Sequence, residues 1–529
     1  MNQNKDLAQT LLADGTEKNS MHIESAVIQL DTGERLTVCP WFQGDKSGKT
    51  TADHTFCQID LCQDAFSLLW DRTSAELRAE ACMPCKAPDR RLIVNIKNTQ
   101  NDHAGNELKR VDYMEMGIRA LLEDDSFTLN RGTCTHHKIG LFAAFAQQVD
   151  NKLVVDKVGD QLDAKIREFS TTNVVDMFQR QLALLFGHHS GAYTFGKGVV
   201  QFPSWFAKHF PTLKLHKMDR QVGSRHGVMM KNAMVHYAMF DAYREWCKYM
   251  QVEVKDANAL ENRALSKLQT VELKAVLRAR GLFYSKIHHV LLCAFKSSKR
   301  EATTADACSF LQQLKVYAER MVNDASFVLD DADDKLFADD QVLHQEYSKW
   351  ADHGSTKVLI DTLMKPDTAT RDLTISCLEA YGGTLLSQLE TNSSKYIEGG
   401  EYWKLFNEPA LTDKQKRKKK HFATCPTTSD PMESVFGIFD YDIKAHTNLS
   451  LQTASGMTAW RMNKTAEWLE SLPKELQTIV IDLARKMYSK TIREGKDNFE
   501  NAVAAKLARQ EAVVAENDKK RKRRLYSDT

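Results

Sequence analysis

Residues 22–42 read HIESAVIQLDTGERLTVCPWF, two runs rich in β-branched and aromatic residues on either side of the turn-like sequence DTGE. Runs of this kind, bounded by Gly and Asp, predict paired strands. Similar patterning continues along the chain, with helical periodicity in between. The expected strands span 22–30, 35–42, 54–62 and 90–98, and the expected helices span 74–82 and 106–125. This order of three strands, a helix, a strand and a helix predicts a mixed α/β domain over residues 22–149.

Beyond this domain the pattern changes, and apolar residues recur every three or four positions. That spacing predicts a large all-α region over 150–415. A compact apolar segment over 425–480 is expected to return to the sheet domain. Residues 481–529 are rich in Ala, Glu, Lys and Arg, which predicts a helical basic tail. Residues 1–20 are expected to be disordered.

The chain has 529 residues, more than one hydrophobic core usually organises, and 42% of them are hydrophobic and 27% charged. This composition predicts a soluble globular protein of two or three domains. No stretch approaches the roughly 18–20 apolar residues of a membrane span, and the first residues lack the pattern of a signal sequence. Eleven scattered cysteines favour reduced thiols in the cytoplasm or nucleus.

The formal net charge is only +2, but basic residues cluster in two runs, Lys414–Lys420 and Lys519–Arg524. Such runs are typical of nuclear import signals or of contacts with the phosphate backbone of nucleic acids. The alternative is a solvated loop and a frayed tail. Together the two runs favour a nuclear protein whose partner is DNA.

Two short sequence patterns are similar to a nucleotide-binding loop and to a zinc site, but we expect neither ligand. Residues 44–51, GDKSGKTT, have one residue too few between the glycines for a phosphate-binding loop, and a strand rather than a helix is expected to follow. Four cysteines could in principle hold a zinc ion: Cys57, Cys62, Cys82 and Cys85. Because the first two are expected on opposite sides of a strand, buried free cysteines are the preferred interpretation, and a structural zinc is not expected.

Three acids suit a site that holds two divalent metal ions, which requires carboxylates from different parts of a sheet. Asp31 ends the run VIQLD, Asp102 follows RLIVNIKNTQN, and Glu433 begins ESVFGIFD. Mg²⁺ prefers such oxygen ligands. Each acid also has a purely structural interpretation: a turn residue for the first, a helix N-cap for the second and a first-turn helix acid for the third. Asp45 and Asp60 are possible substitutes for the first acid.

The sequence around the third acid resembles a known family. Pro426-Thr-Thr-Ser429-Asp-Pro-Met-Glu433-Ser-Val-Phe436 is similar to the late motif of the hAT transposases and of hAT-like, transposon-derived proteins. The proline, the hydroxyl run, the glutamate and the phenylalanine coincide, whereas the arginine of the family pattern is Ser434 here. In that family the glutamate is the third metal ligand.

Two earlier segments extend the resemblance. Asp102-His-Ala-Gly-Asn106 is similar to the motif of the second acid, and Cys134-Thr-His-His137 is similar to a Cys-x-x-His motif that follows it. The resemblance implies a ribonuclease-H-like α/β core interrupted by a large all-α insertion, with a helical C-terminal tail. It places Cys134 and His137 near a site that binds Mg²⁺ or Mn²⁺.

The function that this resemblance implies is cutting and joining of DNA by a nuclear transposase, with self-association as a further possibility. Catalysis depends on an intact triad of Asp31, Asp102 and Glu433. The zinc-binding DNA-recognition finger common in such transposases has no matching Cys/His set before residue 39. The alternative is therefore a domesticated, catalytically inactive protein that binds DNA or other partners. A helical scaffold whose motif matches are accidental is a third possibility.

A second resemblance concerns residues 265–286, LSKLQTVELKAVLRARGLFYSK, within the segment 265–297. They are similar to a SAP module, a pair of short helices that places basic side chains on DNA phosphates. The residues expected to make these contacts are Lys274, Arg278, Arg280 and Lys286. The alternative is an ordinary amphipathic helix pair.

Overall fold

The structure is a computed structural model, and the chain divides into two compact units. The structure describes residues 9–18, 21–30, 35–43, 48–81, 83, 95–101, 105–158, 174–187, 198–219, 226–295, 302–330, 336–337, 339–423, 425–428, 430–446 and 449–487, with scattered residues of 500–518. The sheet unit comprises Met1–Cys134 and Leu411–Thr529, and the helical unit comprises Thr135–Ala410. Each unit is described by itself.

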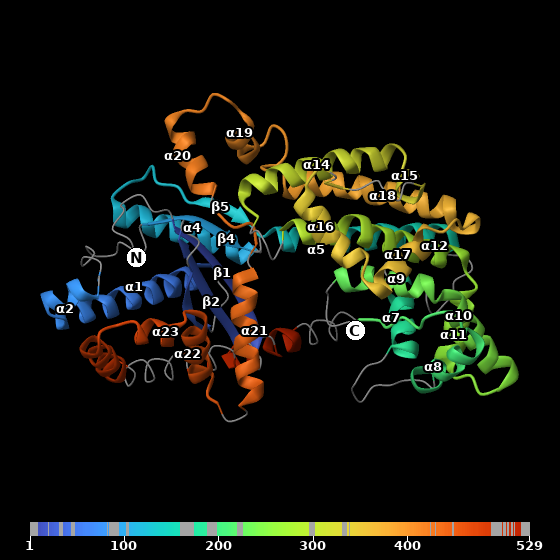
Figure 1. Ribbon diagram of the computed structural model, residues 1–529, viewed down its shortest axis with the longest axis horizontal. Coiled ribbons are helices and arrows are strands. Elements are labelled where there is room, and N and C mark those ends of the chain that lie inside the picture. The colour runs from blue at the N-terminus through green and yellow to red at the C-terminus, as the bar shows by residue number, and fades with distance from the viewer. Residues whose placement is uncertain are drawn as a thin grey trace. The chain divides into compact units, whose positions relative to one another are not determined.

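The sheet unit contains a five-stranded mixed sheet (Figure 1). Its strands are β1 (Gln9–Lys18), β2 (Met21–Leu30), β3 (Arg35–Gln43), β4 (Ile96–Asn101) and β5 (Asn130–Thr133). Their order across the sheet is β3-β2-β1-β4-β5. The first three strands form an antiparallel meander, and β4 and β5 run parallel to β1.

The strand register shows which ends lie together. Gln9, the first residue of β1, pairs with Leu30 at the end of β2 and with Ile96 at the start of β4. Three residues further along β1, Leu12 pairs with Gln100 near the end of β4. The end of β2 therefore lies beside the start of β4, at the opposite end of that strand from Asn101.

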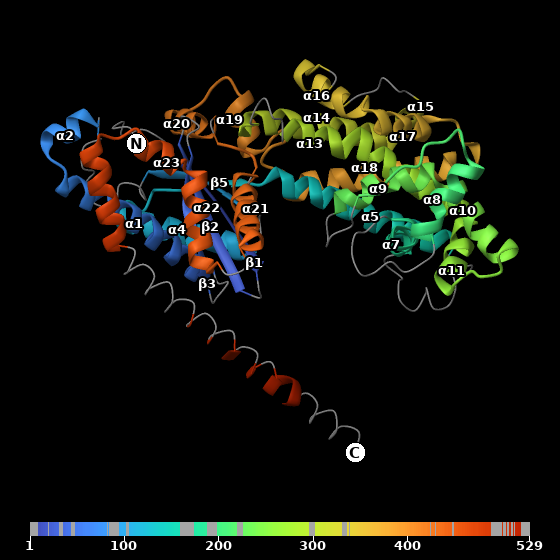
Figure 2. The same cartoon turned by 60° about the horizontal axis from the view of Figure 1, so that its bottom comes forward.

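Helices cover both faces of this sheet (Figures 1 and 2). Because strand side chains alternate between the two faces, Leu11 and Leu12 enter different cores. Leu11 packs with residues of α1 (Gly48–Arg72) and α4 (Gly105–Leu122). Leu12 packs against Val435 of α21 (Asp430–Ala445). The remaining helices named in this unit are α2 (Ala75–Glu80), α20 (Asp413–Phe422), α22 (Leu451–Met462) and α23 (Thr465–Glu470).

The edge strand β3 is joined to the end of α22 by one side chain. The backbone N–H of Thr37 donates to Asn463 Oδ1 at 2.7 Å, and Asn463 Nδ2 donates to the Thr37 carbonyl at 3.0 Å. The amide group thus occupies both backbone hydrogen-bonding groups of Thr37 on this side of the strand.

The helical unit is built around α12 (Val271–Phe283), whose residues from Ala275 to Phe283 are all buried. Before α12 come α5 (Thr135–Val158), α7 (Val174–Phe186), α8 (Gly198–His209), α9 (His226–Ala238), α10 (Phe240–Lys248), the π-helix η1 (Tyr249–Glu253) and α11 (Ala259–Leu268). After it come the π-helix η2 (Tyr284–His288), α13 (His289–Phe295), α14 (Thr304–Asn323), α15 (Phe327–Asp330), α16 (Gln341–Ala351), α17 (Gly354–Met364), α18 (Thr368–Asn392) and α19 (Glu401–Asn407). Gly281 permits close packing here, because a Cβ at this position would lie 2.9 Å from Leu363 Cδ2. Among the described residues, no helix is both long enough and apolar enough to cross a membrane.

The fold class expected from the sequence is wrong. The structure is 76% helical with one small five-stranded mixed sheet, so the chain is mostly α-helical rather than an α/β ribonuclease-H-like core with an insertion. The strands expected over 22–30 and 35–42 are confirmed as β2 and β3. The units divide after Cys134 and after Ala410, whereas the sequence analysis placed these boundaries at 149 and 415.

Two local predictions are also wrong. Residues 54–62 belong to helix α1, because Ala52, Thr55 and Ile59 recur at helical spacing and all three are buried on one side of the helix. Residues 9–18, expected to be disordered, form strand β1 in the middle of the sheet. This strand has few apolar residues, and its pairing with β2 on one side and β4 on the other stabilises it.

Candidate functional site

The motif that contains Glu433 lies on the sheet. Residues 425–428, which precede α21, are buried, and Val435 of α21 is fully buried against Leu12 of β1 and Val27 of β2. The N-terminal half of α21 is therefore fixed over the two central strands. Glu433 is a residue of this helix, but its side chain lies outside what the structure describes.

Strand β4 connects this motif to the sheet through polar side chains that are buried. Gln100 Nε2 donates to the carbonyl of Thr427 at 2.9 Å, and Asn98 Nδ2 donates to the carbonyl of His421 at 3.1 Å. Asn98 Oδ1 in turn accepts a hydrogen bond from Asn130 Nδ2 of β5 at 2.9 Å. Because buried amides need hydrogen-bond partners, these contacts position the segment that leads into α21.

A glycine in β5 makes room for the contact of Gln100. Gly132 pairs with Gln100 across the parallel strands. A Cβ at Gly132 would lie 2.0 Å from Gln100 Oε1, far closer than any non-bonded contact allows. Glycine in a strand often marks such a close approach, and here it lets the Gln100 side chain reach Thr427.

Two of the three acids expected to hold metal, Asp31 and Asp102, lie outside the described residues. Their described neighbours are nevertheless informative. Leu30 lies beside the start of β4, whereas Asn101 ends it, so the two are about 16 Å apart along the strand direction at roughly 3.3 Å per residue. An acid that follows Leu30 is therefore poorly placed to share a metal with one that follows Asn101.

Strand β1 contains a further acid, Asp14, which was not among the acids expected from the sequence. Asp14 belongs to this central strand and pairs with Ser25 of β2. It lies two residues beyond Leu12, which pairs with Gln100, and Asp102 lies two residues beyond Gln100 in the sequence. Two residues, Asn19-Ser20, separate β1 from β2, and two residues is the commonest length of a hairpin connection. This short spacing was the sequence signal for β1.

Carboxylates are the donors that Mg²⁺ and Mn²⁺ prefer, so Asp14, Asp102 and Glu433 are of a residue type that suits such ions. Among the side chains that the structure describes, no group of three or more His, Cys, Asp or Glu could hold a metal ion. The side chains of Asp14 and Glu433 are not among them, and neither is Asp102.

Cys134 and His137 were expected near the acids. Cys134 follows β5 and is buried, and His137 is exposed in the first turn of α5. They fall in different units, with the division directly after Cys134. Their role near a metal site stays a prediction.

Arg280 was expected to contact DNA, but its side chain is fully buried in the helical unit. Arg280 makes two hydrogen bonds to the Asp150 carboxylate, of 2.6 and 2.7 Å, and one of 2.6 Å to Asp176. Tyr381 donates its hydroxyl to Asp150 at 2.5 Å. Burial by itself would lower the pKa of Arg280, but the two carboxylates outweigh it and raise that pKa. This guanidinium neutralises buried acids and does not face solvent.

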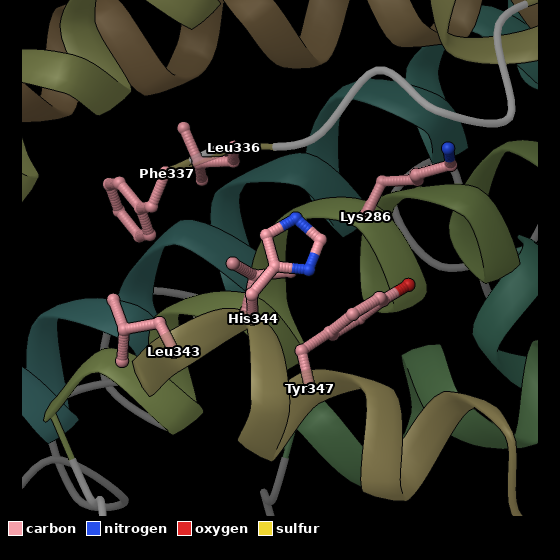
Figure 3. Close-up of a pocket in the computed structure, with 7 residues that line it drawn as sticks. Lys286, Leu336, Phe337, Leu343, His344 and Tyr347 are labelled. Carbon is pink, nitrogen blue, oxygen red and sulfur yellow. The ribbon is translucent and has the colours of Figure 1, made fainter. Parts of the chain in front are cut away.

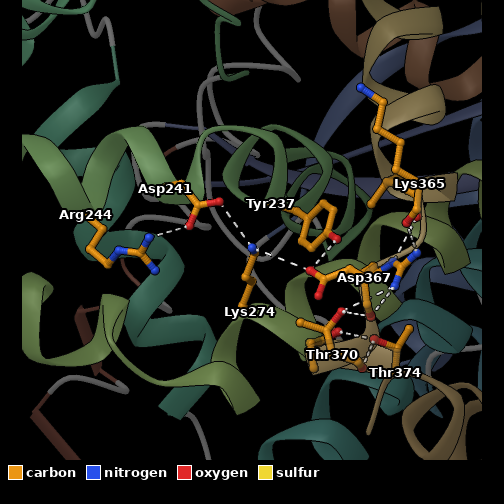
Figure 4. Close-up of polar contacts among 11 residues, drawn as sticks. Tyr237, Asp241, Arg244, Lys274, Lys365, Asp367, Thr370 and Thr374 are labelled. Atoms are coloured by element: carbon orange, nitrogen blue, oxygen red, sulfur yellow. Dashed lines mark hydrogen bonds and ion pairs between the residues drawn. The ribbon is translucent and has the colours of Figure 1, made fainter. Parts of the chain in front are cut away.

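Arg278 and Lys274 likewise act within the helical unit, and Figure 4 shows Lys274 between Asp241 and Asp367. Arg278 is buried and donates to the carbonyls of Leu363 at 2.9 Å and Lys365 at 2.6 Å, at the end of α17. Lys274 Nζ lies 3.2 Å from a carboxylate oxygen of Asp241 and 3.5 Å from one of Asp367. Burial alone would raise the pKa of Asp367, but Lys274 and neighbouring hydrogen bonds lower it.

Lys286, the fourth expected contact, is buried in η2 and lines a small cavity (Figure 3). The cavity measures about 20 Å³, room for about one water molecule, and its other walls include Leu343 and Tyr347. Three of the four side chains expected to contact DNA phosphates are thus buried and the fourth is ion-paired, so they do not form an exposed basic surface. Contact of this segment with DNA stays a prediction.

The remaining sequence patterns have mixed outcomes. Cys57 and Cys62 are exposed on helix α1 rather than on a strand, and Cys82 and Cys85 lie outside the described residues. Helix α1 begins at Gly48, so a helix does follow the glycine-rich sequence, but residues 44–47 lie outside the described residues as well. The basic run from Lys414 forms α20, and the run from Lys519 is not described.

Comparison with known proteins finds no match among family models and none among curated proteins. The similarity to hAT-like proteins therefore rests on the motifs quoted above.

Proposed function

We propose that this chain is a transposon-derived, hAT-like protein that acts on DNA by metal-dependent phosphodiester chemistry. The acids of the site are Asp14, Asp102 and Glu433. The observation that carries the proposal is the hydrogen bond from Gln100 to the Thr427 carbonyl. It joins the end of β4, after which Asp102 follows, to the segment that leads into the helix of Glu433.

Asp14 replaces Asp31 in this proposal because of the strand register. Carboxylates that share a two-metal site must lie close together in space, since such sites hold their ions only about 4 Å apart. Asp14 belongs to β1, which pairs directly with β4, and α21 packs on the same strand through Val435. Asp31 follows Leu30, which lies beside the start of β4 and not beside its end.

The three carboxylates would hold Mg²⁺ or Mn²⁺. When bound, two such ions supply an activated water or 3′ hydroxyl and stabilise the leaving oxygen of the phosphodiester. The protein's own contribution is positional: Asn98 and Gln100 fix the polypeptide before α21, and Val435 fixes the helix on β1. Nuclear location and self-association on DNA belong to the same proposal.

The test is a nicking assay of the full chain with Mg²⁺ or Mn²⁺, on DNA that flanks its own gene, where the ends of an ancestral element would lie. Glu433→Gln and Asp14→Asn should each lower the rate about 10²- to 10³-fold, because each removes a few kcal/mol of charge stabilisation. Asp31→Asn is the matched control and should keep the rate of the unmodified chain. Calorimetric titration with Mn²⁺ gives a second readout, in which only the first two variants should weaken binding.

Two outcomes would overturn the proposal. Loss of nicking in Asp31→Asn but not in Asp14→Asn would show that the register argument has chosen the wrong acid. Binding of DNA without metal-dependent nicking by the unmodified chain would favour the domesticated, non-cutting protein.

A further inference from the structure

Helix α20 is strongly basic and folds as a well-defined helix in the sheet unit. Its N-cap, Thr412, forms a capping box with Gln415: the Gln415 N–H donates to Thr412 Oγ1 at 3.3 Å, and the Thr412 N–H donates to Gln415 Oε1 at 2.9 Å. Asp413 in the first turn and basic residues in the last turn complement the helix dipole. The basic run is therefore a fixed surface and not a loop.

The base of α20 is attached to the sheet. Phe422 is fully buried, and the carbonyl of His421 accepts the hydrogen bond from Asn98 of β4. Both views show α20 beside the edge of the sheet that contains β4 and β5 (Figures 1 and 2). The same strand holds Thr427 through Gln100, so α20 and the proposed acid site share one support.

One face of α20 carries a stripe of exposed cations: Lys414, Arg417 and Lys420. Residues three apart lie on neighbouring positions of a helix surface, so these side chains form a continuous row. Of the residues that the structure describes, none forms an ion pair with this row, whereas the adjacent Lys416 pairs with Asp413 at 3.3 Å. Three exposed cations that make no ion pair with the described residues suit an external polyanion.

We propose that this stripe of Lys414, Arg417 and Lys420 binds the phosphate backbone of the DNA strand on which the acid site acts. This inference rests on the proposed function for its partner. The stripe extends over about 9 Å at 1.5 Å per residue, a length along which one strand of B-DNA presents two or three phosphates at 3.4 Å each. Because lysine and arginine contact phosphates without reading bases, the contact is independent of sequence.

DNA suits the stripe better than a nuclear import receptor. The cations are displayed on a folded, capped helix next to the sheet, and a receptor that takes a free basic peptide would have to unwind it. Import remains a measurable outcome of the test below.

The test compares two triple variants of the full chain by fluorescence anisotropy on a random-sequence DNA duplex, in EDTA, over a series of salt concentrations. Lys414→Gln/Arg417→Gln/Lys420→Gln should weaken binding on the order of 10²-fold near 0.1 M salt and reduce the slope of log K against log salt by about 2.7, or 0.9 per lost contact. Glutamine keeps the helix propensity of lysine, so α20 should stay folded. The control, Lys208→Gln/Lys217→Gln/Lys349→Gln, removes three exposed charges from the helical unit and should leave the slope unchanged.

The outcomes separate this inference from the proposed function. An equal change in both triple variants, or an unchanged slope in the α20 variant, overturns the inference even if the unmodified chain nicks DNA. A reduced slope confined to the α20 variant supports it even if no nicking is found, because EDTA removes any dependence on metal. Unchanged DNA binding together with lost nuclear accumulation would assign the stripe to import instead.

Discussion

Helices α12 and α20 both carry clustered basic residues, yet they use them in opposite ways. In α12, Arg278 and Arg280 are buried, and their hydrogen bonds go to backbone carbonyls and carboxylates of the helical unit. In α20, the cations are exposed or partly exposed, and Phe422 is the residue of that helix that is fully buried. The difference lies in the residues between the charges, because α12 places Leu273, Val276 and Leu277 among them and α20 places only polar residues. A cluster of basic residues in the sequence therefore does not by itself indicate an exposed, ligand-binding surface.

The largest loss of stability is expected from replacing Arg280, a buried arginine of α12. Arg280→Met leaves Asp150 and Asp176 without their buried countercharge, and breaking such a pair by removing one partner typically costs about 3–5 kcal/mol. Native-state amide hydrogen exchange of α12 should report this loss as a lower free energy of opening. DNA binding should be unaffected at temperatures where the variant is folded.

The matched control is Arg371→Met. Arg371 also makes two hydrogen bonds to one carboxylate, of 2.7 and 2.6 Å to Asp330, but both side chains are largely exposed. Exposed pairs contribute about 0–1 kcal/mol. If both variants lost equal stability, burial would not be what distinguishes the arginines of α12.

Acid should weaken the helical unit through a buried histidine. His236 in α9 is fully buried, and burial lowers its pKa to about 3. The folded chain keeps this ring neutral while the unfolded chain protonates it below about pH 6.5, so its contribution is complete above that pH and is lost as the pH falls. The free energy of unfolding should therefore fall as the pH drops below 6.5, by on the order of 2 kcal/mol between pH 6.5 and 4.5 from this group.

Hydrogen exchange of α9 against pH measures this effect. His236→Leu should make the slope shallower by about one proton over the same range, since no titrating ring remains. A parallel variant at the exposed His353 provides the comparison. Should His353→Gln flatten the slope as much, burial would not be the cause.

The smallest expected effect concerns the polar support beneath α20 and α21. Gly132→Ala would force Gln100 away from Thr427, and the lost hydrogen bond should cost about 1 kcal/mol. Exchange of the amides at 425–428 and the nicking rate should both report the change. Gly437→Ala, on α21 where a Cβ meets nothing within 4 Å, should instead stabilise the helix by about 0.5–1 kcal/mol. Identical effects of the two variants would argue against a role for Gln100.

The fold could be predicted from the sequence only where the local pattern and the tertiary environment agree. Strands β2 and β3 and helix α4 have clear periodicity and were predicted. Helix α1 was mistaken for a strand because the sequence HTFCQIDLC has apolar residues that suit both periods. Strand β1 was missed because it has few apolar residues of its own, and its pairing with β2 and with the sequence-distant β4 stabilises it.

The candidate site was predictable in part for the same reason. The sequence motif around Glu433 makes this residue a candidate third acid, but the choice between Asp14 and Asp31 depends on a register that only the pairing of β1 with β4 reveals. The arginines of α12 could not be assigned from sequence, because their partners Asp150 and Leu363 lie far away in the chain.

The amide of Asn463 has a consequence for the behaviour of the protein in concentrated solution. An edge strand with free backbone groups is a template on which a second chain can add a strand, and proteins protect such edges against aggregation. By occupying both groups of Thr37, Asn463 interrupts that template near the start of β3. A single side chain at the end of a helix thus limits uncontrolled assembly at this edge of the sheet.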